Sequence, residues 1–189
     1  MNFALSIFRF ITKYYSLTTN DYYITNHYQK GVKPMKLSTR GRYALRAMID
    51  LAQIQCNNSK PISLRDISLR QDISLQYLEQ LFNKLKKADL VKSTRGAGGG
   101  YLLAKEAEEI NAGDIIRAVE GPIVLVDCIL AGKKVDKNSP KKCKKIEDCT
   151  IRVLLDEVAK KINQILDATS LKDLCKIAQK IKEGQKNER

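Results

Sequence analysis

Apolar residues recur every three to four positions along several stretches of the chain between positions 41 and 181. This spacing places them on one face of an α-helix, so each stretch predicts an amphipathic helix. Several of these helices begin after a polar residue that can accept a hydrogen bond from a first-turn amide, namely Ser63, Ser74 and Asn111. The predicted helices cover residues 41–52, 63–70, 75–88, 113–119 and 150–166, and a last helix begins at residue 170.

The second and third predicted helices are short and are joined by the tight turn Asp72–Ser74. The third is apolar on one face and polar or basic on the other, which is typical of a helix-turn-helix. Residues 90–103 follow as a strand, a hairpin with Gly at four of the five positions 96–100, and a second strand. A phosphate-binding loop is the rival interpretation of these glycines, but no Gly-Lys-Ser/Thr follows them. We therefore predict a mainly α protein: a winged helix-turn-helix domain with a small two-stranded wing, followed by a long C-terminal dimerisation helix.

The charge balance narrows the class of partner. The chain has 34 Lys+Arg against 21 Asp+Glu, a formal net charge of +13, which favours an anionic partner and nucleic acid first. No apolar stretch approaches the ~20 residues that a membrane helix needs, so no membrane partner is expected. The only His is at position 27, and no nucleophile–base pair or carboxylate pair forms a catalytic motif. We therefore expect a binding protein and not an enzyme.

Residues 1–34 differ in composition from the rest of the chain. They hold five of the eight Tyr, three of the four Phe and the only His. A secretory signal fits poorly because Arg9 interrupts the apolar run 3–10 and no small-residue cleavage site follows; an amphipathic membrane-surface helix is another interpretation. Residues 30–32, Lys-Gly-Val, match a translated ribosome-binding site, so we hypothesise that Met35 is the native start and that 1–34 is a non-native or disordered extension.

The rest of the chain divides into three segments. Residues 35–122 form the predicted DNA-binding domain. Residues 123–149, here called the cysteine loop, carry three Cys, and seven Lys lie between positions 133 and 145. Residues 150–189 carry the long helix, whose apolar stripe predicts a dimer interface, and the C-terminal helix, with a polar tail from 184 that is expected to fray.

The cysteines indicate a cytoplasmic protein with reduced thiols. Five Cys without a credible secretory signal favour metal ligands or redox groups over a disulfide framework. Cys128, Cys143 and Cys149 lie in the cysteine loop. Cys56 and Cys175 are interpreted as structural, and Cys175 in particular as a small hydrophobe beside the apolar stripe of the last helix.

Three strings of residues together carry a resemblance to a known family: MKLSTRGRYA from Met35, ISLQYLEQLF from Ile73 and RGAGGGY from Arg95. With them, the chain from 35 to 182 resembles the IscR-type winged-helix transcriptional repressors, a family that includes NsrR and CymR. The resemblance implies a homodimer that binds pseudo-palindromic double-stranded promoter DNA, with a protein partner of cysteine or iron–sulfur metabolism as a further possibility. The run Glu120–Ile123 is similar to the CymR branch, which lacks the cluster cysteines.

The resemblance also assigns residues to the DNA. It places one face of the third helix in the major groove, where Gln pairs with adenine and Glu accepts from the cytosine amine. It places Arg95 of the wing in the minor groove of an A·T-rich tract. Arg40 and Arg42, with Arg46, are expected to contact phosphates. The remaining predicted DNA-binding residues are Ser74, Gln76, Tyr77, Glu79 and Gln80 in the helix and Gly98, Gly99 and Tyr101 in the wing.

An iron–sulfur cluster on Cys128, Cys143 and Cys149 is the cofactor that the resemblance implies, with 2Fe–2S favoured over 4Fe–4S. Five residues separate Cys143 from Cys149, as the family motif requires, and fourteen separate Cys128 from Cys143. The fourth ligand is unassigned because Arg152 stands where IscR has a His. Structural zinc and a redox disulfide are the alternatives. We expect a regulator that senses iron–sulfur or redox status; the alternative is a cluster-free cysteine-metabolism regulator of the CymR type, controlled by a partner protein or by thiol oxidation.

Overall fold

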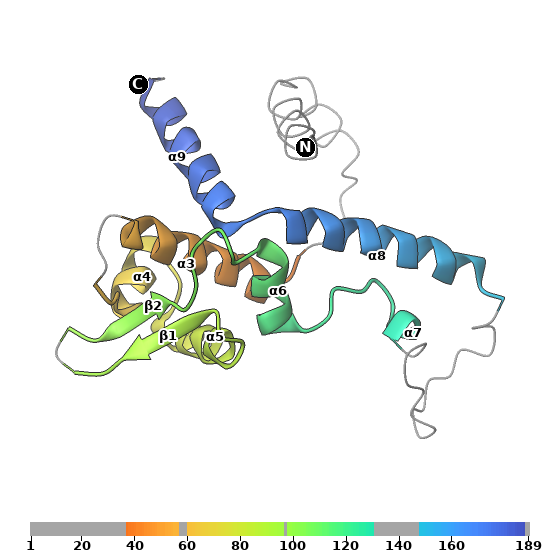
Figure 1. Ribbon diagram of the computed structural model, residues 1–189, viewed down its shortest axis with the longest axis horizontal. Helices are drawn as coiled ribbons and strands as arrows, with labels where there is room; N and C mark the ends of the chain where they lie inside the picture. Colours follow the sequence, from red (N-terminus) through yellow and green to blue (C-terminus); the bar gives the residue numbers. More distant parts are fainter. Residues whose placement is uncertain (1–36, 57–59, 97, 131–147, 188–189) are drawn as a thin grey trace, which may run out of the picture. The chain divides into compact units, whose positions relative to one another are not determined.

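The computed structural model describes residues 37–56, 60–96, 98–130 and 148–187. The chain divides into two units, Met1–Lys36 and Leu37–Arg189, and every described residue lies in the second. The hypothesis about residues 1–34 therefore falls outside the described residues. The second unit is mainly helical with one small sheet, as predicted (Figure 1). Its elements are α3 (Thr39–Gln55), α4 (Leu64–Gln71), α5 (Leu75–Lys87), β1 (Val91–Thr94), β2 (Gly100–Leu103), α6 (Ala112–Glu120), α7 (Asp127–Leu130), α8 (Thr150–Ala168) and α9 (Leu171–Asn187).

Polar caps begin five of these helices, and the sequence predicts three of them. Ser63, Ser74 and Asn111 each accept a hydrogen bond from the amide three residues further on, at 3.1, 3.4 and 2.8 Å. Ser38 caps α3 by accepting from the amides at positions 40 and 41 at 3.1 and 3.3 Å. The fifth is Ser170 before α9, whose hydroxyl accepts from the amide of Asp173 at 3.1 Å. Each bond satisfies an amide that has no partner within its helix. The four predicted helices between residues 41 and 119 are confirmed, with ends displaced by three residues at most.

The wing is an antiparallel pair of strands, as predicted, with four residue pairs in register. Its hairpin turns through Gly96 and Gly98, whose φ angles of +105° and +81° lie in the left-handed region that favours glycine. Gly100 is required for a different reason, since a Cβ there would collide with the backbone of Ile62. The amide and carbonyl of Ile62 pair with those of Tyr101 at 3.0 and 2.8 Å. The segment before α4 is therefore attached to the base of the wing.

One hydrophobic core holds the helices and the wing together. Phe82, at its centre, is fully buried, and the ring of Tyr101 packs against it edge-on with centroids 4.9 Å apart. Helix α9 joins this core by packing against α3 through Leu171 and Cys175, which are 0% and 6% exposed. The sequence analysis groups α9 with α8, but α9 contributes its first turns to the core of the DNA-binding domain. It continues to Asn187, beyond the point where the polar tail was expected to fray.

A buried ion pair ties α3 to α4. Asp50 is the one buried charged residue in the described part of the chain. Its carboxylate accepts three hydrogen bonds from the guanidinium of Arg70, at 2.7, 3.1 and 3.1 Å, and one from the amide of Gln71 at 3.0 Å. The hydrogen bond to Asp50 is the main cause of the raised pKa of Arg70. This pair fixes the first helix of the helix-turn-helix on the core.

The segment after the core contains two helices, α7 and α8, and much of the apolar surface of α8 is exposed. The sequence predicts no helix in residues 123–149, whereas the structure contains the short helix α7 within them. Helix α8 begins at Thr150, as predicted. Several of its large apolar side chains are exposed in this single chain: Ile151, Val153, Leu154, Val158 and Ile165. Within the described ranges, no helix is both long enough and apolar enough to cross a membrane.

Candidate nucleic-acid interface and cysteine segment

Helix α5 separates its two faces as a base-reading helix requires. From Leu78 onward its large aliphatic side chains and Phe82 are buried in the core, Leu78, Phe82 and Leu85 completely so, whereas Leu75 in the first turn is 39% exposed. The opposite face presents hydrogen-bonding side chains to solvent. The exposed predicted residues on this face are Ser74, Gln76, Glu79 and Gln80. Amide and carboxylate groups held on a rigid helix are suited to reading base edges in a major groove.

Tyr77 belongs to the same helix but is only half-exposed. Its ring meets the ring of Tyr43 edge-on, with centroids 5.7 Å apart and planes at 86°. The guanidinium of Arg46 lies 5.6 Å from the Tyr43 ring and also donates to the side chain and backbone carbonyl of Gln71. Arg46, which is predicted to contact phosphate, therefore already bridges α3 to α4 in the unbound chain. The packing also sets the direction in which Tyr77 points.

The first turn of α3 gathers the other predicted phosphate contacts. Arg40 and Arg42 are exposed there, and Arg42 donates to Thr39 at 3.2 Å. The hydroxyl of Ser38 donates to the carboxylate of Glu120 at 2.5 Å. Gly41 leaves room for that carboxylate, because a Cβ on Gly41 would collide with it. The end of α6 therefore places a negative charge against the first turn of α3, a contact that no local pattern in the sequence predicts.

The wing residues divide into exposed and packed members. Arg95 and Gly98 are exposed at the hairpin, where an arginine can enter a groove. The amide of Gly99 donates to the carbonyl of Gly96 at 2.9 Å and closes the turn. Tyr101 packs against the core and pairs with the segment before α4, so the structure gives its ring a packing role in the unbound chain.

The structure describes two of the three predicted ligand cysteines. Cys128 lies in α7 and Cys149 immediately precedes α8; both thiols are half-buried, and the two helices are in contact. Cys143 lies outside the described residues. Arg152, at the position where the resemblance implies the His ligand of IscR, is half-buried in the first turn of α8. Across residues 37–56, 60–96, 98–130 and 148–187, no three Cys, His, Asp or Glu side chains are grouped closely enough to hold a metal ion.

The two other cysteines have different environments. Cys175 packs in the core as predicted, and burial raises the pKa of its thiol to about 11. Cys56 is exposed beyond the end of α3, so the interpretation of it as a structural residue is wrong. The difference arises because the buried face of α3 ends at Leu51 and Ala52.

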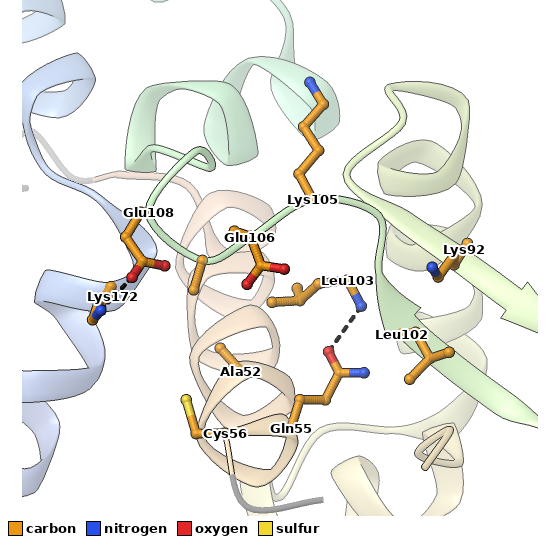
Figure 2. A pocket seen from close by; sticks show the side chains of 11 residues that line it. Ala52, Gln55, Cys56, Lys92, Leu102, Leu103, Lys105, Glu106, Glu108 and Lys172 are labelled. Atoms are coloured by element: carbon orange, nitrogen blue, oxygen red, sulfur yellow. Dashed lines mark hydrogen bonds and ion pairs between the residues drawn. The ribbon is translucent and has the colours of Figure 1, made fainter. Parts of the chain in front are cut away.

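Cys56 lies at the edge of a pocket of about 450 Å³ between α3, β2 and the start of α9 (Figure 2). At one side Gln55 accepts a hydrogen bond from the amide of Leu103 at 2.9 Å. At the other Lys172 forms an ion pair with Glu108, which lowers the pKa of that carboxyl group and raises that of the ammonium. None of the predicted DNA-binding or ligand residues lines this pocket.

A polar cluster between α6 and α8 was also missed by the sequence analysis. Arg117 donates to Asp114 on its own helix at 2.9 Å, and to Asp167 and Asn163 on α8 at 2.6 and 3.2 Å. The hydrogen bond to Asp167, and after it the one to Asp114, raises the pKa of Arg117. The local signal in the sequence was the Asp–Arg spacing of three residues within one helix. Its partners on α8 lie about fifty positions away, and nothing local identifies them.

Comparison with known proteins gives related regulators. A family model described as Rrf2, an iron-dependent transcriptional regulator, matches residues 37–177. IscR of Cereibacter sphaeroides is 57% identical over 86 residues, which are 46% of this chain and 56% of that protein, so the match spans about half of that relative. CymR of Bacillus subtilis is 41% identical over 140 residues, 74% of this chain and 89% of that protein.

Solved structures give a similar result. The structure of T. potens IscR matches with a TM-score of 0.59 at 39% sequence identity, covering 76% of this chain and 88% of that one. These relatives are named transcriptional regulators, and they include both the IscR type and the CymR type.

Proposed function

Since this chain belongs to the Rrf2 family of transcriptional regulators, we propose that it acts in the cytoplasm as a homodimer that binds promoter DNA through α5 and the wing. We further propose that the cysteine loop is its sensing element and carries an iron–sulfur cluster on Cys128, Cys143 and Cys149. The observation that carries the DNA-binding assignment is the geometry of α5, whose apolar face is buried while its polar face is exposed beside a wing that ends in Arg95.

The homodimer is supported by the exposure of α8. Ile151, Val153 and Leu154 are each more than 60% exposed in the single chain. Contiguous apolar surface of this kind marks an interaction site. A second copy of α8 would cover it and would place two recognition helices on one face of the DNA, as pseudo-palindromic operators require.

The donor set suits an iron–sulfur cluster. Thiolates are the usual ligands of such clusters, and the thiol of Cys149 stands at the N-terminus of α8 without a competing cap hydrogen bond. When bound, the cluster would supply an iron- or redox-dependent state; the chain's own part is to hold α7 against the start of α8.

A cluster-free regulator is the second candidate, because CymR of Bacillus subtilis and IscR of Erwinia tasmaniensis match this chain equally, each at 41% identity over 140 residues. In addition, Arg152 stands where the resemblance implies the His ligand of IscR. Anaerobic purification with absorption spectroscopy and iron analysis separates the two candidates. We expect visible absorption that is lost in a Cys143→Ala variant. Colourless protein that resists reconstitution yet binds its promoter would favour the second candidate.

The DNA interface is tested with two arginine variants and one control. Arg95→Ala should weaken binding to the specific site by about 1–3 kcal/mol and relax the preference for A·T-rich flanks. Arg42→Ala should weaken all sequences alike and reduce the salt slope by about 1. Lys161→Ala, on the exposed surface of α8, is the control. Unchanged operator affinity in Arg95→Ala would refute the wing assignment.

A further inference from the structure

The polar cluster between α6 and α8 is the starting point. Arg117 reaches across from α6 to Asp167 and Asn163, which lie four residues apart on one face of α8. The fit is tight, because a Cβ on Gly113 would collide with both Asp167 and Arg117. We refer to Asp114, Arg117, Asn163 and Asp167 as the α6–α8 joint.

Among the described residues, few other contacts hold α8 in place. Ala159 is its only buried residue, and most of its large apolar side chains are exposed. Helix α6, in contrast, is anchored deep in the core by Ile115, Ile116 and Val119, each 2% exposed or less. The joint therefore connects α6, which is fixed in the core of the DNA-binding domain, with α8, which makes few other packing contacts with that domain.

Asn163 connects a third element to the same place. Its amide donates to the carbonyl of Ala159 at 2.8 Å, within α8, and to the carbonyl of Ile123 at 3.0 Å. Ile123 is the first residue of the cysteine loop, five positions before Cys128. One side chain thus binds α6, α8 and the beginning of the cysteine loop at once.

We propose that the α6–α8 joint sets the orientation of α8 relative to the recognition helix, and so determines which spacing between operator half-sites the dimer accepts. This inference rests on the proposed dimer and makes Arg117 and Asn163 positioning residues for DNA binding. In a dimer formed through α8, the direction of α8 from each domain determines the separation of the two α5 helices. The two half-sites of an operator lie about one helical turn of DNA apart, 10–10.5 base pairs, so that both face the dimer. A change in the direction of α8 would therefore change the half-site spacing that the dimer prefers.

The hydrogen bonds of the joint are suited to holding α8 in a fixed orientation on α6. Arg117 is forked between carboxylates on two helices, and a planar guanidinium held at several points resists rotation better than a single contact does. Arg117, like any arginine, is charged at every physiological pH, so its hydrogen bonds to Asp114 and Asp167 are charge-assisted. Because Asn163 also binds Ile123, displacement of the cysteine loop removes one of its contacts and loosens the joint.

The test measures affinity against half-site spacing. An operator selected from random DNA is remade with its half-sites moved by one and two base pairs in each direction, and a single half-site duplex is included. Wild-type protein should lose about tenfold or more in affinity at two base pairs. Arg117→Met keeps the apolar stem of the side chain. We expect this variant to lose less than about threefold in affinity when the half-sites are moved by two base pairs, and to bind the single half-site as wild type does.

Two further variants keep the test decisive. Asp167→Asn removes the negative charge of one exposed partner and leaves an amide oxygen that can still accept, so it should flatten the spacing profile in part, even if Arg117→Met folds poorly. Lys172→Met breaks the ion pair with Glu108, which joins other elements, and should leave the profile as in wild type. A wild-type profile in both joint variants, or the same flattening in Lys172→Met, overturns the proposal while the DNA-binding function stands. A wild-type protein that selects no DNA overturns the function itself.

Discussion

Replacing Arg70 with Met should destabilise the domain by about 2–3 kcal/mol, because it leaves a buried carboxylate without its main partner. The side chain of Asp50 is only 8% exposed, and three of the four hydrogen bonds that its carboxylate accepts come from Arg70. Removing one partner of a buried pair costs about 3–5 kcal/mol. Arg70 is itself 39% exposed, so water replaces part of what is lost and the expected cost is lower.

The free energy of unfolding is measured by urea denaturation, followed by circular dichroism at one fixed protomer concentration. The matched control is Lys172→Met, which breaks an ion pair at the surface and should give no measurable change. Since α4 leads into the recognition helix, Arg70→Met should also weaken operator binding. A stability within about 0.5 kcal/mol of wild type would refute the reasoning that Asp50 depends on Arg70.

Three other outcomes follow from the packing. Gly100→Ala should detach the segment before α4 from the wing, because the new Cβ collides with the Ile62 backbone, and hydrogen exchange at Tyr101 should rise. Iodoacetamide at pH 8 should modify the exposed Cys56 much faster than Cys175, and equal rates measured by mass spectrometry would contradict the burial. Because burial raises the pKa of Cys175 from 9.0 to about 11, the folded state keeps the thiol proton up to a higher pH than the unfolded state does. Stability relative to a Cys175→Ala variant should therefore be constant below pH 9 and fall as the pH rises towards 11.

The elements that the sequence predicts well are those with local signals. The helices between residues 41 and 119 are defined by apolar spacing and by caps such as Ser63 and Asn111, which act within three residues. The wing is defined by its glycines. Helix α7 was missed because four residues are too few to show a helical period.

Contacts between distant parts of the chain could not be predicted in this way. The apolar stripe of α9 has the same appearance as a dimer helix, and only its position beside α3 shows that Leu171 belongs to the core. The bond from Ser38 to Glu120 spans 82 positions. Both depend on how the helices pack, and periodicity carries no information about that.

The candidate site was predicted by residue type more than by arrangement. The exposed face of α5 follows directly from its period. That Arg46 contacts phosphate stays a prediction; in the unbound chain Arg46 donates to the side chain and backbone carbonyl of Gln71 on α4, a contact that helical period does not predict. The joint around Arg117 was not anticipated, although Asp114 and Arg117 stand at helical spacing.

The central claim is that the cysteine loop controls DNA binding by α5 and the wing. The most direct measurement titrates wild-type protein, purified without oxygen, and a variant with Cys128, Cys143 and Cys149 all replaced by Ala against one set of promoter fragments. Both proteins should be dimeric, and their affinities should differ by about 5- to 150-fold at one class of site or more, the range of a typical coupling between sites. Identical affinities at every promoter would contradict the claim and would leave a DNA-binding protein whose cysteines do not regulate it.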